Sequence, residues 1–430
     1  MTALIDYDDS LDTLARTVRT ELGEEVLRQG VALREAAGRL AFFVEGELTA
    51  TQRKNLSEAL SFRLGKYART DRVLATRGDP GAAQILDAPS FQWLLVDGVS
   101  VRYLDRRVVG MDWLAGPTAI APGAPRAVFA SLKGGVGRTT ALCVAASELA
   151  RRGYNVLAVD LDLEAPGLGG MLLPQSAELR PRCGVIDYLV ELSVTGETAS
   201  VLEGMVTGSA LDVGRGGRVD VAPAYGTATR PEHYLGKLSR AMLDTGPDGM
   251  MLPVRNKVAQ MVDALTTRGS YDVVLIDARA GLAELSAGPL LGLGASLLLF
   301  STAQQQSLED LRLLLAHLYT LTQPGQGSPW TALRCILAKA TPNMGRNEWF
   351  MDELYRLFQD YVYEAQEGLE GFNFDLNDPE APHSPVPIAF NPLFADWDPA
   401  RRISDLSQPF YEAAFRPFLE ALTRQLELNR

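Results

Sequence analysis

The sequence FASLKGGVGRTT, residues 129–140, decides the fold of this chain. It follows a short apolar run, residues 127–130, and precedes a helix-like segment, residues 141–151. Glycines let successive backbone N–H groups turn inward, and the N-terminus of the following helix adds partial positive charge. Thr139 stands where a hydroxyl group binds Mg²⁺, and Thr140 can reach a phosphate oxygen. We therefore predict a nucleotide site between a strand and a helix.

The glycine-rich turn departs from the usual P-loop pattern, G-x-x-x-x-G-K-[ST], at two positions. Leu132 replaces the first glycine, Arg138 replaces the lysine, and an additional lysine, Lys133, opens the loop. The resulting K-G-G-x-G-[KR]-T-T resembles the deviant Walker A motif of the ParA/MinD family of P-loop ATPases. The nucleotide-binding residues that this resemblance implies are Lys133, Gly134, Gly135, Val136, Gly137, Arg138, Thr139 and Thr140.

The resemblance also implies a homodimer that closes on ATP. In that family the early lysine reaches across a nucleotide-sandwich dimer to the partner's phosphates, so Lys133 is expected to act in trans. Arg138 keeps the positive charge of the usual lysine, but it is bulkier and not interchangeable with it. Because most of the cradle is backbone, we expect nucleotide binding to survive and the hydrolysis rate to be the property affected.

Two further segments resemble the family's motifs in the right order. Residues 155–162 form a largely apolar run that ends in Asp160 and Asp162. It resembles the family's second strand, which implies that Asp162 orients the attacking water and that Asp160 lies on the metal side. Together with Lys133, Asp162 is the predicted catalytic residue.

The other segment, residues 271–277, is an apolar strand that ends in Asp277, the Walker B pattern. The resemblance implies that Asp277 holds the hydration shell of Mg²⁺, with Thr139 and Asp160 completing the metal site. Gly281 is expected to offer its amide to the γ-phosphate. Arg279, between them, either contacts a phosphate, the dimer or a partner, or is a solvated loop residue. All three motifs follow strands, and open α/β sheets bind ligands at the carboxyl ends of their strands.

The base is predicted to be adenine. GTP-specific P-loop proteins use [NT]-K-x-D, and residues 338–341, AKAT, have the lysine without the aspartate. Asn391 follows the last predicted strand, where relatives place adenine contacts; a structural turn at Asn-Pro is the equal alternative. We therefore expect ATP and Mg²⁺ as cofactors.

Composition fits a soluble cytoplasmic protein. The net charge is −12, from 41 Lys and Arg against 53 Asp and Glu, so no global positive field draws the chain to DNA or anionic membrane. DNA binding through a local patch stays open. The three cysteines (Cys143, Cys183 and Cys335) and three histidines lack metal-ligand spacing. The longest apolar run, residues 287–300, is shorter than the roughly 20 residues of a membrane span.

Residues 115–125, rich in Pro, Gly and Ala, predict a linker between two domains. The preceding module, residues 1–114, is predicted to be α+β and either to bind a partner or to complete the dimer. Its expected elements are a helix-like span at residues 8–35, a strand at 39–44, a helix at 49–67 capped by Thr49 or Thr51, a strand at 72–76, and strand signals at 91–104 broken by a turn at Asp97-Gly98.

The predicted ATPase domain, residues 126–430, alternates strands and helices. The expected strands are residues 126–130, 156–160, 218–222, 273–277, 296–301, 335–339 and 386–390. Such alternation indicates an α/β fold, a mostly parallel sheet with helices on both faces. The family resemblance covers Arg126 to Leu426. Residues 225–257 add a basic cluster that either meets DNA, phosphates or a partner, or is a solvated helix face: Arg230, Lys237, Arg240, Arg255 and Lys257.

Three functions are compatible with these features. The first is an ATP-driven dimerisation switch that positions or gates a partner assembly. The second, motivated by Arg138, is a nucleotide-binding scaffold with little or no turnover, in which ATP is an assembly ligand. The third is a small-molecule ligase or amidotransferase of related fold, which requires a substrate pocket. Some branches of the ParA/MinD family have paired cysteines at the dimer face, a tyrosine-rich tail or a basic C-terminal membrane helix. This sequence has none of these features.

Overall fold

The computed structural model describes residues 5–210, 216–322, 329–364, 372–394, 397–399 and 408–428. The chain divides into two compact units, Met1–Gly116 with His317–Gln326, and Pro117–Ala316 with Gly327–Arg430. In the part that is described, no helix combines the length and the apolar character needed to cross a membrane.

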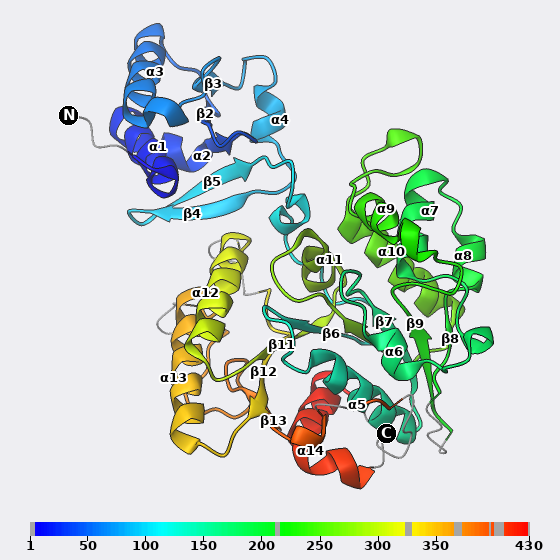
Figure 1. Ribbon diagram of the computed structural model, residues 1–430. Coiled ribbons are helices and arrows are strands. Elements are labelled where there is room, and N and C mark those ends of the chain that lie inside the picture. Colours follow the sequence, from blue (N-terminus) through cyan, green and yellow to red (C-terminus); the bar gives the residue numbers. More distant parts are fainter. Residues whose placement is uncertain are drawn as a thin grey trace. The chain divides into compact units, whose positions relative to one another are not determined.

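The smaller unit contains a five-stranded mixed sheet with the strand order β3-β2-β1-β5-β4 (Figure 1). Two helices cover its core, and their leucines recur at helical spacing, such as Leu56, Leu60 and Leu64. The elements are α1 (Tyr7–Leu22), α2 (Glu24–Gln29), β1 (Val31–Arg34), β2 (Leu40–Val44), α3 (Ala50–Leu64), η1 (Gly65–Tyr67), β3 (Leu74–Thr76), α4 (Ala82–Leu86), β4 (Gln92–Val96), β5 (Val99–Asp105) and η2 (Met111–Leu114).

One expectation for this unit is wrong: residues 8–35 are not one helical span. Gly23, with a φ of 90°, ends α1, and the chain enters β1 after Gly30. A Cβ at Gly30 would lie 2.3 Å from the ring of Phe42, so only glycine permits this close approach. The turn at Asp97-Gly98 is confirmed, since it joins antiparallel β4 and β5.

The larger unit is built on an eight-stranded sheet with the order β13-β12-β11-β6-β10-β7-β9-β8, parallel except for β8 at one edge. This confirms the predicted α/β class. The strands are β6 (Arg126–Ser131), β7 (Asn155–Asp160), β8 (Thr207–Gly208), β9 (Arg218–Ala222), β10 (Val273–Asp277), β11 (Ser296–Ser301), β12 (Leu333–Ala340) and β13 (Val386–Ala389).

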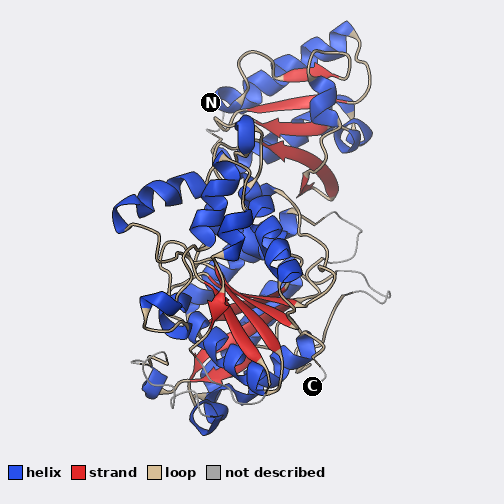
Figure 2. Cartoon of the chain, turned by 90° about the vertical axis from the view of Figure 1, so that its right-hand side faces the viewer, coloured by secondary structure: helices blue, strands red, loops and turns tan. Residues whose placement is uncertain are grey.

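Helices cover both faces of this sheet (Figure 2). On one face α5 and α14 pack in a single apolar core with alternate strand residues, including Phe129 and Phe300, whose rings both contact Phe418 of α14. On the other face lie α10 and α11 (Figure 1). The helices are α5 (Arg138–Arg151), α6 (Leu168–Leu172), η3 (Ala177–Leu179), α7 (Val185–Val194), α8 (Ala199–Glu203), α9 (Pro231–Ala241), η4 (Pro247–Gly249), α10 (Val254–Arg268), α11 (Glu284–Gly292), α12 (Gln305–Thr320), α13 (Met344–Tyr361), η5 (Pro392–Phe394) and α14 (Gln408–Gln425).

Candidate functional site

The glycine-rich turn lies between β6 and α5 at the carboxyl edge of the sheet. Gly135 and Gly137 have φ values of 71° and 93°, in the left-handed region that a side chain disfavours. A Cβ at either glycine would meet nothing within 4 Å, so backbone conformation rather than crowding requires glycine there. Gly137 is the residue that precedes α5, and its carbonyl accepts a hydrogen bond from the amide of Ala141. The turn therefore presents a helix N-terminus to the site, as a phosphate cradle requires.

Sheet register brings two of the predicted aspartates together. Asp277 at the end of β10 pairs with Asp160 at the end of β7, and both are fully buried. The oxygens of Asp160 accept hydrogen bonds from the amides of Asp162 and Leu168, each at 3.1 Å. Burial raises the pKa of Asp160 well above its usual value, and the Asp277 charge adds to the effect.

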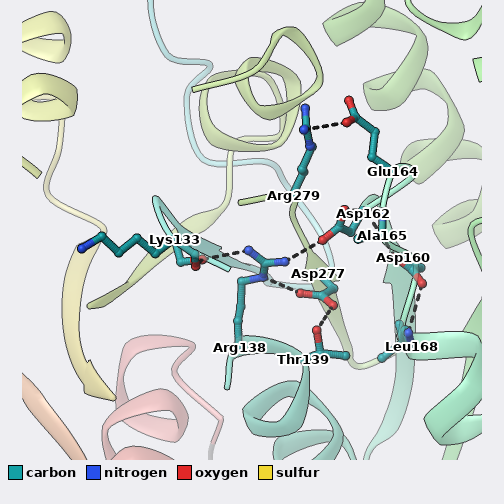
Figure 3. Close-up of polar contacts among 11 residues, drawn as sticks. Lys133, Arg138, Thr139, Asp160, Asp162, Glu164, Ala165, Leu168, Asp277 and Arg279 are labelled. Carbon is teal, nitrogen blue, oxygen red and sulfur yellow. Dashed lines mark hydrogen bonds and ion pairs between the residues drawn. The ribbon is translucent and has the colours of Figure 1, made fainter. Parts of the chain in front are cut away.

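Arg138 is the centre of the polar contacts at this edge (Figure 3). Its Nε donates to Asp277 Oδ1 at 2.8 Å, and one Nη donates to Asp162 Oδ2 at 2.9 Å. The other Nη donates to the Ser131 hydroxyl at 2.8 Å. Only 7% of Arg138 is exposed. The residue that replaces the P-loop lysine is thus bound to the residues predicted to manage metal and water.

Thr139 completes this arrangement. Its hydroxyl donates to Asp277 Oδ2 at 2.5 Å, so both oxygens of Asp277 accept hydrogen bonds. Burial raises the pKa of Asp277, and the Arg138 guanidinium opposes that shift. The predicted metal residues Thr139 and Asp277 therefore do lie together.

The P-loop also borders a cavity with a volume of about 360 Å³. The other walls are the ends of β12 and β13, the residues that follow β13, and α14. Its lining residues are Ser131, Gly135, Val136, Gly137, Arg138, Thr139, Thr140, Ala338, Lys339, Ile388, Ala389, Phe390, Asn391, Phe394 and Phe415. A cavity with a phosphate cradle at one side and aromatic side chains at the other suits a nucleotide.

Asn391 is in this cavity wall, as the adenine prediction requires, and it also forms the alternative turn. Its Oδ1 accepts a hydrogen bond from the amide of Leu393 at 3.0 Å. The two roles are compatible, because this bond engages the side-chain carbonyl. Lys339 is the lysine of the AKAT segment, which lacks the aspartate of GTP-specific proteins. Its Nζ donates a hydrogen bond to the Gly135 carbonyl at 2.6 Å.

Lys133 points away from the aspartates (Figure 3). Its Nζ lies 3.6 Å from an Asp310 carboxylate oxygen on α12, and its carbonyl accepts a hydrogen bond from Ser131. About a quarter of the Lys133 side chain is exposed. In this conformation the lysine therefore has a partner within its own chain.

The loop after β10 is held at two points. The Gly281 amide, expected to serve a γ-phosphate, donates to the Ser131 carbonyl at 2.9 Å. Arg279 forms an ion pair with Glu164 at 2.6 Å, which joins this loop to the one that follows Asp162. This contact explains Arg279 without a phosphate.

The basic cluster of residues 225–257 does not form one surface. Lys257 is fully buried, and its Nζ donates to Ser193 and to the Leu243 carbonyl. Arg255 donates to the Leu291 carbonyl, and Lys237 pairs with Asp187. The sequence predicted either a ligand-binding cluster or a solvated helix face. Both predictions are wrong for Lys257, because it lies on the buried side of α10.

Sequence reasoning missed Ser131, Glu164 and Asp310. Ser131 contacts both Arg138 and the Lys133 carbonyl, yet nothing distinguishes it in sequence from the last residue of any strand. A second cavity, of about 190 Å³, was also missed; it lies beside Asp160 and includes Arg180 and Tyr225 in its lining. The ligase hypothesis requires a substrate pocket, and it specified no place for one.

Comparisons with known proteins bear on this site. A family model described as the CobQ/CobB/MinD/ParA nucleotide binding domain matches residues 127–318. No curated protein matches the chain. Solved structures with a similar fold include pNOB8 ParA bound to nonspecific DNA, at 19% identity, 72% coverage of this chain, 100% of that chain and a TM-score of 0.44. Another is the cell division ATPase MinD of Pyrococcus furiosus, at 20% identity, 70% coverage of this chain, 99% of that chain and a TM-score of 0.43. A third is a plasmid partition protein from Borrelia burgdorferi, at 17% identity, 53% coverage of this chain, 83% of that chain and a TM-score of 0.36.

Proposed function

We propose that this chain, whose residues 127–318 match the model described as the CobQ/CobB/MinD/ParA nucleotide binding domain, is an ATP-binding dimerisation switch. The observation that carries the proposal is the cavity of about 360 Å³ that joins the glycine-rich turn to the ends of β12 and β13. In this proposal the amides of residues 134–140 hold the phosphates at the start of α5. Phe390 and Asn391 face the base.

The switch itself depends on Lys133. Its side chain is partly exposed and points away from the aspartates of its own site, an orientation that leaves it available to a second subunit (Figure 3). Closing the dimer would exchange the Asp310 contact for a phosphate of the partner's nucleotide. A phosphate carries more charge than one carboxylate, so the exchange is favourable when ATP is present.

Mg²⁺ is the expected companion of ATP, with Thr139, Asp160 and Asp277 as its predicted ligands. In this conformation these residues do not fit the ion. Both oxygens of Asp277 and both of Asp160 already accept hydrogen bonds from the chain. The Arg138 guanidinium, moreover, bridges Asp277 and Asp162.

A second candidate function, the scaffold with little turnover, is supported by the same contacts. Asp162 is the proposed partner of the attacking water, but its carboxylate is hydrogen bonded to Arg138 and to the Ala165 amide. Each oxygen of Asp162 thus accepts a hydrogen bond from the chain itself, and a water must compete with these contacts. We therefore propose that turnover is slow unless a partner moves Arg138.

In this proposal residues 1–114 bind the partner protein. Residues 115–125 join them to the ATPase domain, residues 126–430. The described residues that line the nucleotide cavity all belong to residues 126–430, which favours a role in recognition for the α+β module. DNA is the alternative partner. The basic cluster of residues 225–257 does not support it, because this cluster does not form one surface.

The proposal is tested by measuring oligomeric state with light scattering, with and without a non-hydrolysable ATP analogue. We expect dimers only with nucleotide, and we expect Lys133→Ala to remain monomeric while it still binds the analogue. Lys54→Ala, an exposed lysine in α3, is the matched control and should dimerise normally. An unchanged dimer fraction in Lys133→Ala would refute the switch. Dimers with no phosphate release would favour the scaffold.

A further inference from the structure

The Arg138 guanidinium fills a position between two acidic strand ends. It is hydrogen bonded to Asp277, Asp162 and Ser131 at 2.8–2.9 Å, and its side chain is 8% exposed. A buried arginine with three different partners is fixed in place, since each partner fixes a different nitrogen of its planar fork. It is not a side chain that extends freely into the nucleotide cavity.

The carboxylates have an electrostatic requirement of their own. Asp277 and Asp162 lie at the edge where a triphosphate is expected, and three sets of negative charge repel one another unless a cation lies between them. In a metal-dependent site the divalent ion supplies that charge. Here Arg138, the first residue of α5, supplies one positive charge between the two carboxylates. Among the described residues, no group of three or more His, Cys, Asp or Glu side chains is arranged to hold a metal ion.

We propose that Arg138 is the resident counter-ion of Asp162 and Asp277, so that this chain binds its nucleotide triphosphate without needing a divalent cation. This inference rests on the proposed ATP binding, and it adds a departure from the metal dependence that the sequence motifs imply. The guanidinium takes the place of the ion between the carboxylates, and Thr139 donates to Asp277 instead of serving as a metal ligand.

Lysine could not perform this role. Its single ammonium group donates from one point, whereas the Nε and the two Nη atoms of Arg138 reach three residues on two strand ends and one following loop. The contact to Ser131 also ties the guanidinium to the loop, because the same hydroxyl donates to the Lys133 carbonyl at 2.8 Å. Replacing Arg138 by Lys should therefore free carboxylate oxygens for a metal while it keeps a positive charge.

The first test measures the dissociation constant of a fluorescent ATP analogue with excess Mg²⁺ and with EDTA. For the unaltered chain we expect the two values to agree within about threefold, whereas Arg138→Lys should bind about tenfold or more weakly in EDTA. Arg152→Ala, at the far end of α5 and paired with Glu148, is the matched control and should behave as the unaltered chain. Tight binding of the unaltered chain only with Mg²⁺ would overturn the inference and leave the proposed function intact. Absence of binding under both conditions would overturn the proposed function as well.

The second test needs no nucleotide. Mn²⁺ is added to the nucleotide-free protein, and the bound fraction is read by electron paramagnetic resonance. We expect little bound Mn²⁺ in the unaltered chain and in Arg152→Ala, and one bound ion in Arg138→Lys and Arg138→Ala. Equal Mn²⁺ binding by the unaltered chain would contradict the counter-ion role. Should Arg138→Ala fail to fold, Arg138→Lys gives the same comparison with the charge retained.

Discussion

Asp277 is the residue on which the ligand-free site most depends. It is fully buried, and its carboxylate accepts hydrogen bonds from Arg138 and Thr139. Removing one partner of a buried ion pair costs about 3–5 kcal/mol when the other charge stays buried without compensation. Arg138 keeps Asp162 and Ser131 as partners, so we expect Asp277→Ala to lower the free energy of unfolding by up to about 3 kcal/mol, measured by urea denaturation.

The control is Glu412→Ala, which removes one member of a surface pair with Arg416. Such pairs contribute about 0–1 kcal/mol, so this variant should unfold close to the unaltered chain. Equal losses in the two variants would show that the contacts of Asp277 do not stabilise the fold.

The sequence could predict that these residues lie at strand ends beside the glycine-rich turn, but not the contacts among them. The P-loop, Asp160, Asp162 and Asp277 were found because each motif is local and follows an apolar strand. The two aspartate partners of Arg138 are 139 and 24 residues away in sequence, so only sheet register brings them together. The intrachain contact of Lys133 with Asp310 was invisible for the same reason.

At the scale of elements, α3 shows how a short sequence signal fixes a helix start. The sequence left Thr49 and Thr51 as alternative caps, and the structure selects Thr49. Its hydroxyl accepts from the Gln52 amide, while the Gln52 side chain accepts from the Thr49 amide, which is a capping box.

This arrangement predicts that Thr49→Ala lowers the free energy of unfolding of the smaller unit by about 1 kcal/mol, because an amide in the first turn loses its acceptor. Thr51→Ala, two residues later and exposed, is the matched control and should change stability by less than about 0.5 kcal/mol. Urea denaturation followed by circular dichroism measures both. A larger loss of stability in Thr51→Ala than in Thr49→Ala would show that Thr49 is not the residue that caps the helix.

The buried strands were predictable because a strand covered on both faces is a continuous apolar run. The predicted bounds of β9, β10 and β11 agree with those observed. The boundary between α2 and β1 was not predictable from periodicity, since Val26, Leu27, Val31 and Leu33 continue a helix-like spacing through Gly30. The deciding fact is the approach of Gly30 to Phe42, a contact between residues that periodicity does not relate.

At the scale of the whole molecule, the proposed dimer must compete with the contact between Lys133 and Asp310. The Nζ to carboxylate distance is 3.6 Å, and both side chains are about a quarter to a third exposed. A pair so exposed is worth at most about 1 kcal/mol, and less at high salt. The contact is therefore a weak restraint on dimerisation rather than a block.

Asp310→Asn should accordingly favour the ATP-dependent dimer. Each subunit gives up one restraint, so we expect the dimer dissociation constant to fall by about two- to tenfold at low salt, and by less as salt rises. Sedimentation equilibrium with a non-hydrolysable ATP analogue measures this constant. Glu309→Gln changes the adjacent exposed carboxylate on α12 and serves as the control for net charge. If both variants shift the constant equally, the effect is one of overall charge; if Asp310→Asn weakens the dimer, Asp310 supports the interface instead of restraining Lys133.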